Sequence, residues 1–337
     1  MTIDLAIVAE WALKSLILIV MLVTGFAYLT FFERRVLARM QVRIGPNRAG
    51  PMGLLQPIAD GVKLIFKEEL IPDKADKLVF VLAPVITVIP ALIILAVVPF
   101  GPPIEIAGRV VHLGVADGLN VGVLYIMAVA SVAVYGIALA GWSSNNKYAL
   151  LGGLRSTAQM VSYEIALGLS FIGPILLANS MSMRSIVQAQ ESWWFILAQP
   201  IGFMIFLIAT VAEVNRAPFD MPEAEQELAA GYHVEYSGMK FALMFMAEYD
   251  KMIAVAAIGA SLFLGGYWGP WVDRVPLLGP LYLFLKVVAI LFLMIWMRAT
   301  LPRLRYDRLM AFGWKVMLPL ALVNVVLTAV LVIAIGG

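Results

Sequence analysis

The chain has 337 residues, of which 62% are hydrophobic and only 14% charged, and its mean hydropathy is +0.92. Roughly a quarter of the residues in an ordinary soluble domain are charged, so this composition excludes that class and indicates a polytopic membrane protein. The formal net charge of +2 favours no class of partner, and the absence of cysteine excludes disulfides, iron-sulfur clusters and thiolate metal sites in this chain.

Apolar windows of about 20 residues predict the transmembrane helices. The chain is expected to form one all-α membrane domain over residues 1–337, with eight spans near 11–32, 78–99, 121–142, 160–179, 195–212, 241–264, 278–299 and 313–335. The first window is too long for a signal-peptide core, and Glu33-Arg34-Arg35 follows it in place of a small-residue cleavage site. We therefore expect it to remain as a helix, and an even number of spans places both termini on one side.

The distribution of Lys and Arg predicts the orientation. Basic residues are concentrated between the first two spans and between the last two, whereas the alternate loops carry only Arg109, Arg184 and Arg274. The basic connections should face the cytoplasm, so both termini should face the outside.

The connection over residues 33–77 mixes basic, Gly-Pro and apolar residues. Gly-Pro pairs at 45–46 and 50–51 mark turns. Beyond them, Leu55, Ile58, Val62 and Ile65 recur at spacings of three and four over residues 54–66. This spacing predicts an amphipathic helix that lies at the membrane interface.

Glu164 lies at the start of the fourth predicted span, near Gln159 and Tyr163. A buried glutamate that is ionised and unpaired costs several kcal/mol, so it must be partnered, wetted or neutral. Acids inside a membrane segment usually serve a function, and we favour a functional role for Glu164 over a structural one.

Residues 213–249, here called the acid segment, concentrate carboxylates between two apolar runs. Its seven acids are Glu213, Asp220, Glu223, Glu225, Glu227, Glu235 and Glu248. Acids beside a bilayer indicate first a proton relay or an ion path. Asp220 and Glu223 match a capping box, which predicts a short cytoplasmic helix over residues 221–230 with Glu223 and Glu227 on one face.

Structural alternatives exist for several of these residues. Glu225 is turned away from the shared face and could simply be a water-exposed acid in the first helical turn. Ion pairing to Arg216 or Lys251 is the structural alternative for Glu213 and Glu248. His233 is at best a relay candidate. Asp250 and Lys251 should face different directions, and snorkelling at the cytoplasmic end of a span would explain them.

Signatures of soluble enzymes are absent from the sequence. It contains no phosphate-binding Gly loop ending in Gly-Lys-Ser/Thr, no strand-associated GxGxxG, no HExxH and no GxSxG. The chain alone therefore has no visible means of binding a nucleotide or carrying electrons.

Four long motifs resemble one family. They are ERRVLARMQVRIGPNRAGPMGLLQPIADGVKLIFKE at 33–68, GWSSNNKYALLGGLRSTAQMVSYE at 141–164, AEVNRAPFDMPEAEQELAAGYHVEYSGMKFALMFMAEY at 212–249 and RATLPRLRYDRLM at 298–310. Essentially the whole chain, in order and spacing, resembles the H subunit of bacterial NADH:quinone oxidoreductase, respiratory complex I. The resemblance implies an eight-helix component of a translocase in the bacterial inner membrane, with both termini on the periplasmic side.

The resemblance also implies two groups of site residues. Those that would line or border a quinone chamber are Glu33, Arg34, Arg35, Asp60, Lys63, Arg216, Phe219 and Arg298. Those that would continue as a proton path are Glu164, Glu213, Glu223, Glu225, Glu227, Glu235 and Glu248. Asp250-Lys251 departs from the family, where uncharged polar residues are more usual, and Ser131 stands where some members carry an acid.

The family pattern assigns no catalytic residue, metal or cofactor to this chain alone. Quinone would be the substrate, and FMN and iron-sulfur clusters would lie in partner subunits. The partners would be peripheral quinone-site subunits, small membrane subunits and antiporter-like subunits, with no nucleic acid. The membrane anchor of a proton-pumping hydrogenase is the nearer alternative, and a secondary transporter is a more distant one because no internal repeat is visible.

Overall fold

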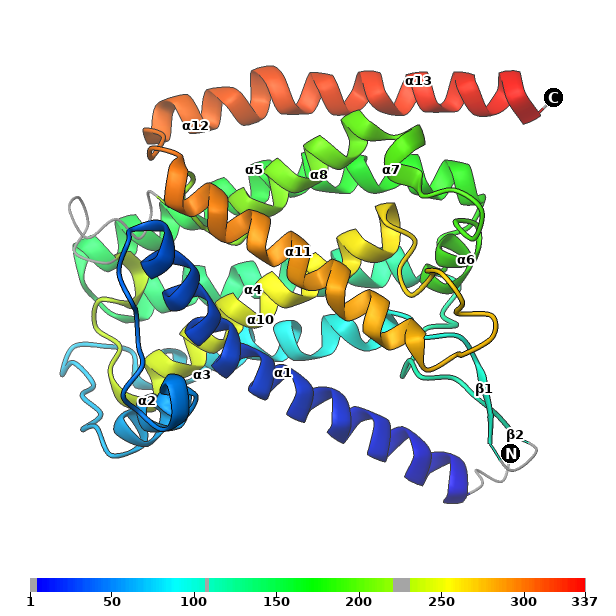
Figure 1. The fold of residues 1–337 in the computed structure, drawn as a ribbon. Helices are drawn as coiled ribbons and strands as arrows, with labels where there is room; N and C mark the ends of the chain where they lie inside the picture. The colour runs from blue at the N-terminus through cyan, green and yellow to red at the C-terminus, as the bar shows by residue number, and fades with distance from the viewer. Residues whose placement is uncertain (1–4, 107–108, 221–230, 337) are drawn as a thin grey trace.

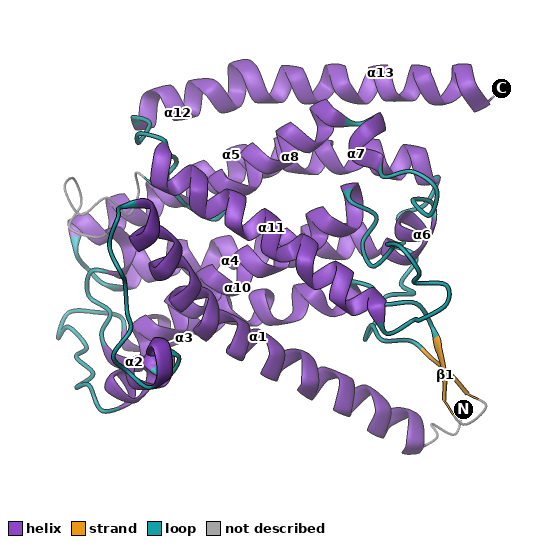
Figure 2. Ribbon diagram, viewed as in Figure 1, coloured by secondary structure: helices purple, strands orange, loops and turns teal. Residues whose placement is uncertain are grey.

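The chain folds as a bundle of helices, shown in Figures 1 and 2. The computed structural model describes residues 5–106, 109–220 and 231–336. Within these ranges the strands are confined to one antiparallel hairpin, β1 (Ile104–Ile106) and β2 (Arg109–Val111), in which Glu105 lies opposite Val110. The prediction of an all-α membrane protein is confirmed.

Each of the eight predicted spans corresponds to a helix. These helices are α1 (Leu5–Met40), α3 (Lys77–Ile93), α4 (Gly122–Ser143), α5 (Lys147–Ala178), α8 (Pro200–Glu213), α10 (Gly238–Phe263), α11 (Leu278–Thr300) and α13 (Leu318–Gly336). Shorter helices are α2 (Gln56–Ile65), α6 (Met183–Gln188), α7 (Phe195–Ala198) and α12 (Tyr306–Phe312). In the described part of the chain, six helices are long and apolar enough to cross a membrane by themselves. The count of eight spans stays a prediction, because α8 has 14 residues and α10 carries several charges.

Two predicted boundaries differ from the structure. The fourth span was expected at 160–179, but α5 begins at Lys147, where the Asn146 side chain accepts a hydrogen bond from the Tyr148 amide at 2.9 Å. The fifth span is interrupted between α7 and α8 at Gln199, whose φ of −131° and ψ of 53° are not helical. Pro200 explains this break, because a residue before proline is disfavoured in the α conformation.

The amphipathic helix predicted over 54–66 is present as α2. Leu55, Ile58, Val62 and Ile65 are all exposed in the isolated chain, so their apolar face is free to meet lipid or a partner. The preceding turn requires Gly53, which has a φ of +81° and whose missing Cβ would lie 2.5 Å from the Pro46 carbonyl oxygen. The other predicted short helix, over 221–230, lies outside the described residues.

The core is centred on α10, which contacts α1, α3, α8 and α11. Figure 1 shows α13 running across α5 and α8 on one side of the bundle. Close packing between α3 and α4 depends on Gly136, because a Cβ there would clash with Thr87 Oγ1. Pro84 in α3 has no amide hydrogen for the Phe80 carbonyl, and the Tyr236 hydroxyl donates to that oxygen at 3.2 Å.

Both ends of the chain lie at the same end of the bundle, the N-terminus beside the β1–β2 hairpin and the C-terminus at the end of α13, and α2 lies at the opposite end (Figure 1). A chain that crosses the membrane an even number of times has both termini on the same side. The end at which α2 and the α4–α5 connection lie should face the cytoplasm if the charge-based orientation holds.

Single thiols test this orientation cleanly because the chain has no native cysteine. Lys147, the first residue of α5, and Asp273, in the connection between α10 and α11, are both exposed, and these two segments lie at opposite ends of the bundle in Figure 1. We expect Lys147→Cys to react with a membrane-impermeant maleimide only from the cytoplasmic side, and Asp273→Cys only from the outside. The unmodified chain is the control, and the reverse labelling pattern would overturn the orientation.

Candidate functional site

The loop that follows α8 is fixed against α5 by a buried hydrogen-bond network. Gln159 Nε2 donates to the Ala212 carbonyl at 2.7 Å, the Phe219 carbonyl at 2.8 Å and Asn215 Oδ1 at 3.1 Å. Asn215 Nδ2 in turn donates to Ser156 Oγ at 2.7 Å. These polar side chains are buried. Their bonds hold the loop in one path, which fixes the position of Arg216.

Glu33, near the end of α1, is a buried carboxylate with three partners from distant parts of the chain. The Tyr249 hydroxyl donates to Glu33 Oε2 at 2.7 Å, and Arg298 of α11 binds Glu33 Oε1. Arg216 Nη1 lies 3.5 Å from the same oxygen. Glu33 is 3% exposed, so its charge depends on these donors in place of water.

Arg216 connects Glu33 to the acid segment. Its Nε lies 2.7 Å from Glu248 Oε1, and its guanidinium stands 4.2 Å from the centre of the Tyr249 ring. Only 7% of Arg216 is exposed. A cation buried this deeply is stabilised by the two carboxylates and the aromatic face together.

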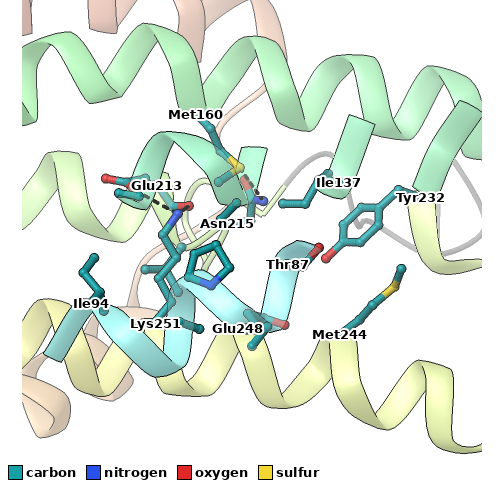
Figure 3. A pocket seen from close by; sticks show the side chains of 16 residues that line it. Thr87, Ile94, Ile137, Met160, Glu213, Asn215, Tyr232, Met244, Glu248 and Lys251 are labelled. Atoms are coloured by element: carbon teal, nitrogen blue, oxygen red, sulfur yellow. Dashed lines mark hydrogen bonds and ion pairs between the residues drawn. The ribbon is translucent and has the colours of Figure 1, made fainter. Parts of the chain in front are cut away.

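Glu213, at the end of α8, pairs with Lys251 in the middle of α10. Lys251 Nζ lies 2.8 Å from Glu213 Oε1 and 3.5 Å from the Glu213 carbonyl oxygen. Figure 3 shows this pair inside the cavity that Glu248 also lines. Glu213 therefore pairs with Lys251, and Glu248 pairs with Arg216. Both ion pairs that the sequence indicates as the structural alternative to a proton relay are present.

The interpretation of Asp250 and Lys251 as snorkelling residues is wrong. Lys251 is 9% exposed and points to Glu213, and Asp250 is fully buried with no hydrogen-bond partner on either oxygen among the described residues. Snorkelling requires a helix end near the surface, whereas these residues lie halfway along α10.

Glu164 receives a hydrogen bond from Ser131 of α4. A cavity of about 20 Å³ is bordered by Glu164, Glu213 and Lys251, and a second one of about 40 Å³ is bordered by Glu213, Glu248 and Lys251. The two cavities share the charged residues Glu213 and Lys251 as well as Ile94 and Ala130, and most of their other lining residues belong to α3, α4, α5, α8 and α10. Together they bring Glu164, Glu213 and Glu248 close to one another.

The residues at the α2 end form a more exposed group. Arg34 Nη1 donates to Asp60 Oδ2 at 2.7 Å, and Lys63 Nζ lies 3.9 Å from Asp60 Oδ1. Arg35 Nη2 donates to the Met52 carbonyl at 2.7 Å. Arg34 directly follows Glu33 in α1, so this exposed group and the buried Glu33 site lie at the same level of that helix.

Some predicted site residues lie apart from this constellation. Phe219 is buried against the Tyr163 ring, with 5.7 Å between ring centres. Glu235 accepts from Asn146 Nδ2 at 2.6 Å and lies in a separate open hollow with Lys147. Glu223, Glu225 and Glu227 lie outside the described residues.

His233 and Asp220 are titratable groups of the acid segment that lie outside the spans. Burial lowers the pKa of His233 to about 4, so its imidazole is neutral at pH 7. Burial raises the pKa of Asp220, and Arg303, which donates to Asp220 Oδ2 at 3.0 Å, opposes that rise.

The site contains residues that the sequence did not single out. Tyr249 and Asn215 have no motif of their own, and only the structure brings them to Glu33 and Gln159. Lys251 was considered in two ways, as a snorkelling residue and as an ion-pair partner of Glu213 or Glu248, and the structure shows the pair with Glu213.

The family model and the similar proteins of known name all indicate the same family. A family model described as NADH dehydrogenase matches residues 13–329. The H subunit of the NADH-quinone oxidoreductase of Protochlamydia amoebophila is 53% identical over 91% of this chain and 92% of its own length. The H subunit numbered 2 of Syntrophobacter fumaroxidans is 52% identical over 96% of each chain, and that of Thermomicrobium roseum is 53% identical over 94% of each. The chain therefore belongs to the NADH dehydrogenase family, as its resemblance to the H subunit predicts.

Proposed function

We propose that this chain, a membrane subunit of an NADH:quinone oxidoreductase, forms part of the quinone chamber and carries the acid path that couples quinone reduction to proton translocation. The observation that carries the proposal is a series of ionisable side chains that begins at Glu33, next in sequence to the Arg34–Asp60 pair, and continues into the bundle. Arg216 lies between Glu33 and Glu248, Lys251 pairs with Glu213, and shared cavities connect Glu248 with Lys251 and Glu213 with Glu164.

The charge balance of the buried part supports a proton function. Glu33, Glu248 and Glu213 each lie beside Arg298, Arg216 or Lys251. Among the described residues, Glu164 has a hydrogen bond from the neutral hydroxyl of Ser131 and no ion pair. A carboxyl group without a cation in low dielectric is a place where a proton can be held, and acids this close together exchange protons as a coupled group.

Coupling follows because neighbouring members of this series lie close to one another. A change of charge at a quinone headgroup near Arg34 and Asp60 would alter the field at Glu33, which shares Arg216 with Glu248. Interacting sites titrate as a group, so a proton taken up at one end changes the affinity for protons further along.

The assembled enzyme would supply what this chain lacks. FMN and iron-sulfur clusters would lie in partner subunits, and quinone would be the substrate. The partners would be peripheral quinone-site subunits, small membrane subunits and antiporter-like subunits, in a bacterial plasma membrane. The relatives bear quinone oxidoreductase names, which favours this assignment over a hydrogenase anchor or a secondary transporter.

The chamber is tested at the Arg34–Asp60 pair. We expect Arg34→Ala or Asp60→Asn, in the assembled complex, to lower kcat/KM for quinone by about tenfold, equivalent to about 1.4 kcal/mol, while NADH oxidation by an artificial acceptor is unchanged. Glu69→Gln is the matched control, because it breaks the ion pair of Glu69 with Lys240 at the same end of the molecule. Unchanged quinone kinetics in both test variants would remove these residues from the chamber.

A further inference from the structure

Lys251 and its partner Glu213 form the polar wall between the Glu248 cavity and the Glu164 cavity in the part of the chain that the structure describes. The cavities measure about 40 and 20 Å³. A water molecule needs roughly 10–15 Å³ on the same measure and two to four polar partners. Each cavity has that room, and each is bordered by carboxylate and ammonium groups that can bind water.

The Glu213–Lys251 pair leaves bonding capacity unused on both sides. Lys251 Nζ contacts Glu213 through Oε1 and the carbonyl oxygen. Glu213 Oε2 is buried and has no hydrogen-bond partner in the described residues. An ammonium group has three donors, so this pair can accept water or a second carboxylate without breaking.

Alternative partners for Lys251 are close at hand. Glu248 is three residues earlier on the same helix, a spacing that places both side chains on one face, and both line the larger cavity. Glu164 lines the smaller cavity with Lys251. Because lysine carries its charge on a flexible four-carbon stem, the ammonium can turn between these acids with little backbone change.

A second buried lysine gives a useful contrast. Lys286 of α11 donates to the Gly266 carbonyl at 2.8 Å and the Trp268 carbonyl at 2.6 Å, and it stands 4.8 Å from the Trp194 ring centre. These carbonyls follow the end of α10, where a cation is favourable. Lys286 therefore has a fully structural explanation, and Lys251 does not.

We propose that Lys251 is a positioning residue that gates proton transfer between the two cavities. While its ammonium faces Glu213, the ion pair closes the polar wall and the cavities are separated. A proton that reaches Glu213 from the larger cavity neutralises the carboxylate and releases the ammonium toward Glu248. Glu213 then passes that proton to the Glu164 cavity, becomes an anion again and recovers Lys251, which remains protonated throughout.

This inference rests on the proposed acid path. It goes beyond that path because it makes one cation, Lys251, control the transfer of protons between the two cavities. The charged groups around Lys251 are Glu164 on α5, Glu213 on α8, Glu248 and Asp250 on α10, and Arg216 in the loop after α8. Removing the ammonium leaves Glu213 surrounded by acids on two other elements. Glu213 would then keep its proton to higher pH.

The test uses the assembled complex in liposomes, with quinone reduction and proton pumping measured across a pH series. We expect Lys251→Met to lower coupled turnover by at least about tenfold at neutral pH and to move the optimum to higher pH. Lys251→Arg, which keeps the charge, should restore the optimum. Lys286→Met is the matched control and should reduce assembly without moving the optimum of the assembled fraction.

The results distinguish a failure of the proposed Lys251 gate from a failure of the proposed acid path. Normal turnover and an unmoved optimum in Lys251→Met, with Glu213→Gln inactive, would overturn the gate and leave the path in place. Normal activity in both variants would overturn the path itself. If Lys251→Met fails to assemble, Lys251→Gln replaces it, because glutamine keeps a hydrogen-bond donor for Glu213 but no charge. An assembled Lys251→Gln complex with normal turnover and an unmoved optimum would overturn the gate, and one with lower turnover and an optimum at higher pH would support it.

Discussion

Replacing Glu248 with glutamine is expected to remove most coupled quinone reduction while the complex assembles almost normally. Glutamine is nearly isosteric with glutamate and keeps its hydrogen-bonding capacity, so only titration and charge are lost. Arg216 would retain a second carboxylate, Glu33, at 3.5 Å after the change. The buried charge of Arg216 therefore keeps a carboxylate partner. For this reason the variant tests proton transfer with little effect on the structure.

The measurement compares proton pumping, quinone reduction and NADH oxidation by an artificial acceptor in the same preparation. A loss of about 100-fold in the first two, with the third unchanged, is expected for removal of a positioned proton carrier. Poor assembly of Glu248→Gln that is rescued by adding Arg216→Gln would instead identify Glu248 as an anchor. Full coupled activity would exclude it from the path.

Replacing Glu33 with glutamine should have the largest effect on stability. Arg298 and Arg216 would both lose a carboxylate partner, and Tyr249 would lose a charged acceptor. Breaking a buried ion pair on one side typically costs about 3–5 kcal/mol, because a charge is left uncompensated. We expect a marked loss of assembled complex and a lower midpoint of thermal unfolding.

Asp307→Asn is the matched control for this change. Asp307 pairs with Arg305 at 2.9 Å, but both side chains are mostly exposed, so the expected cost is under about 1 kcal/mol. Similar melting behaviour of Glu33→Gln and the native chain would contradict a structural role for the Glu33 site.

Sequence reasoning located the helices because hydropathy is a local property. The windows near 78–99, 121–142 and 278–299 agree closely with α3, α4 and α11. Sequence reasoning failed where polar residues of a helix are buried inside the protein. Hydropathy placed the start of the fourth span near 160, although Ser156 and Gln159 belong to α5 and are fully buried.

The partners of the acids were only partly accessible to such reasoning. Ion pairing of Glu213 and Glu248 to Arg216 or Lys251 was foreseen as an alternative, because these residues lie near one another in the chain. The contacts of Glu33 were not, since Tyr249 and Arg298 are 216 and 265 positions away. Only the packing of α1, α10 and α11 brings these residues together.

The hydrogen bonds of Gln159 have a consequence for the evolution of the loop that follows α8. Two of its three acceptors are the main-chain carbonyls of Ala212 and Phe219, which any amino acid would supply. Side chains between them can therefore change while the backbone keeps its path. Relatives could alter the chemistry of this loop by single substitutions without rebuilding its shape, whereas a change at Gln159 itself would remove all three of these hydrogen bonds at once.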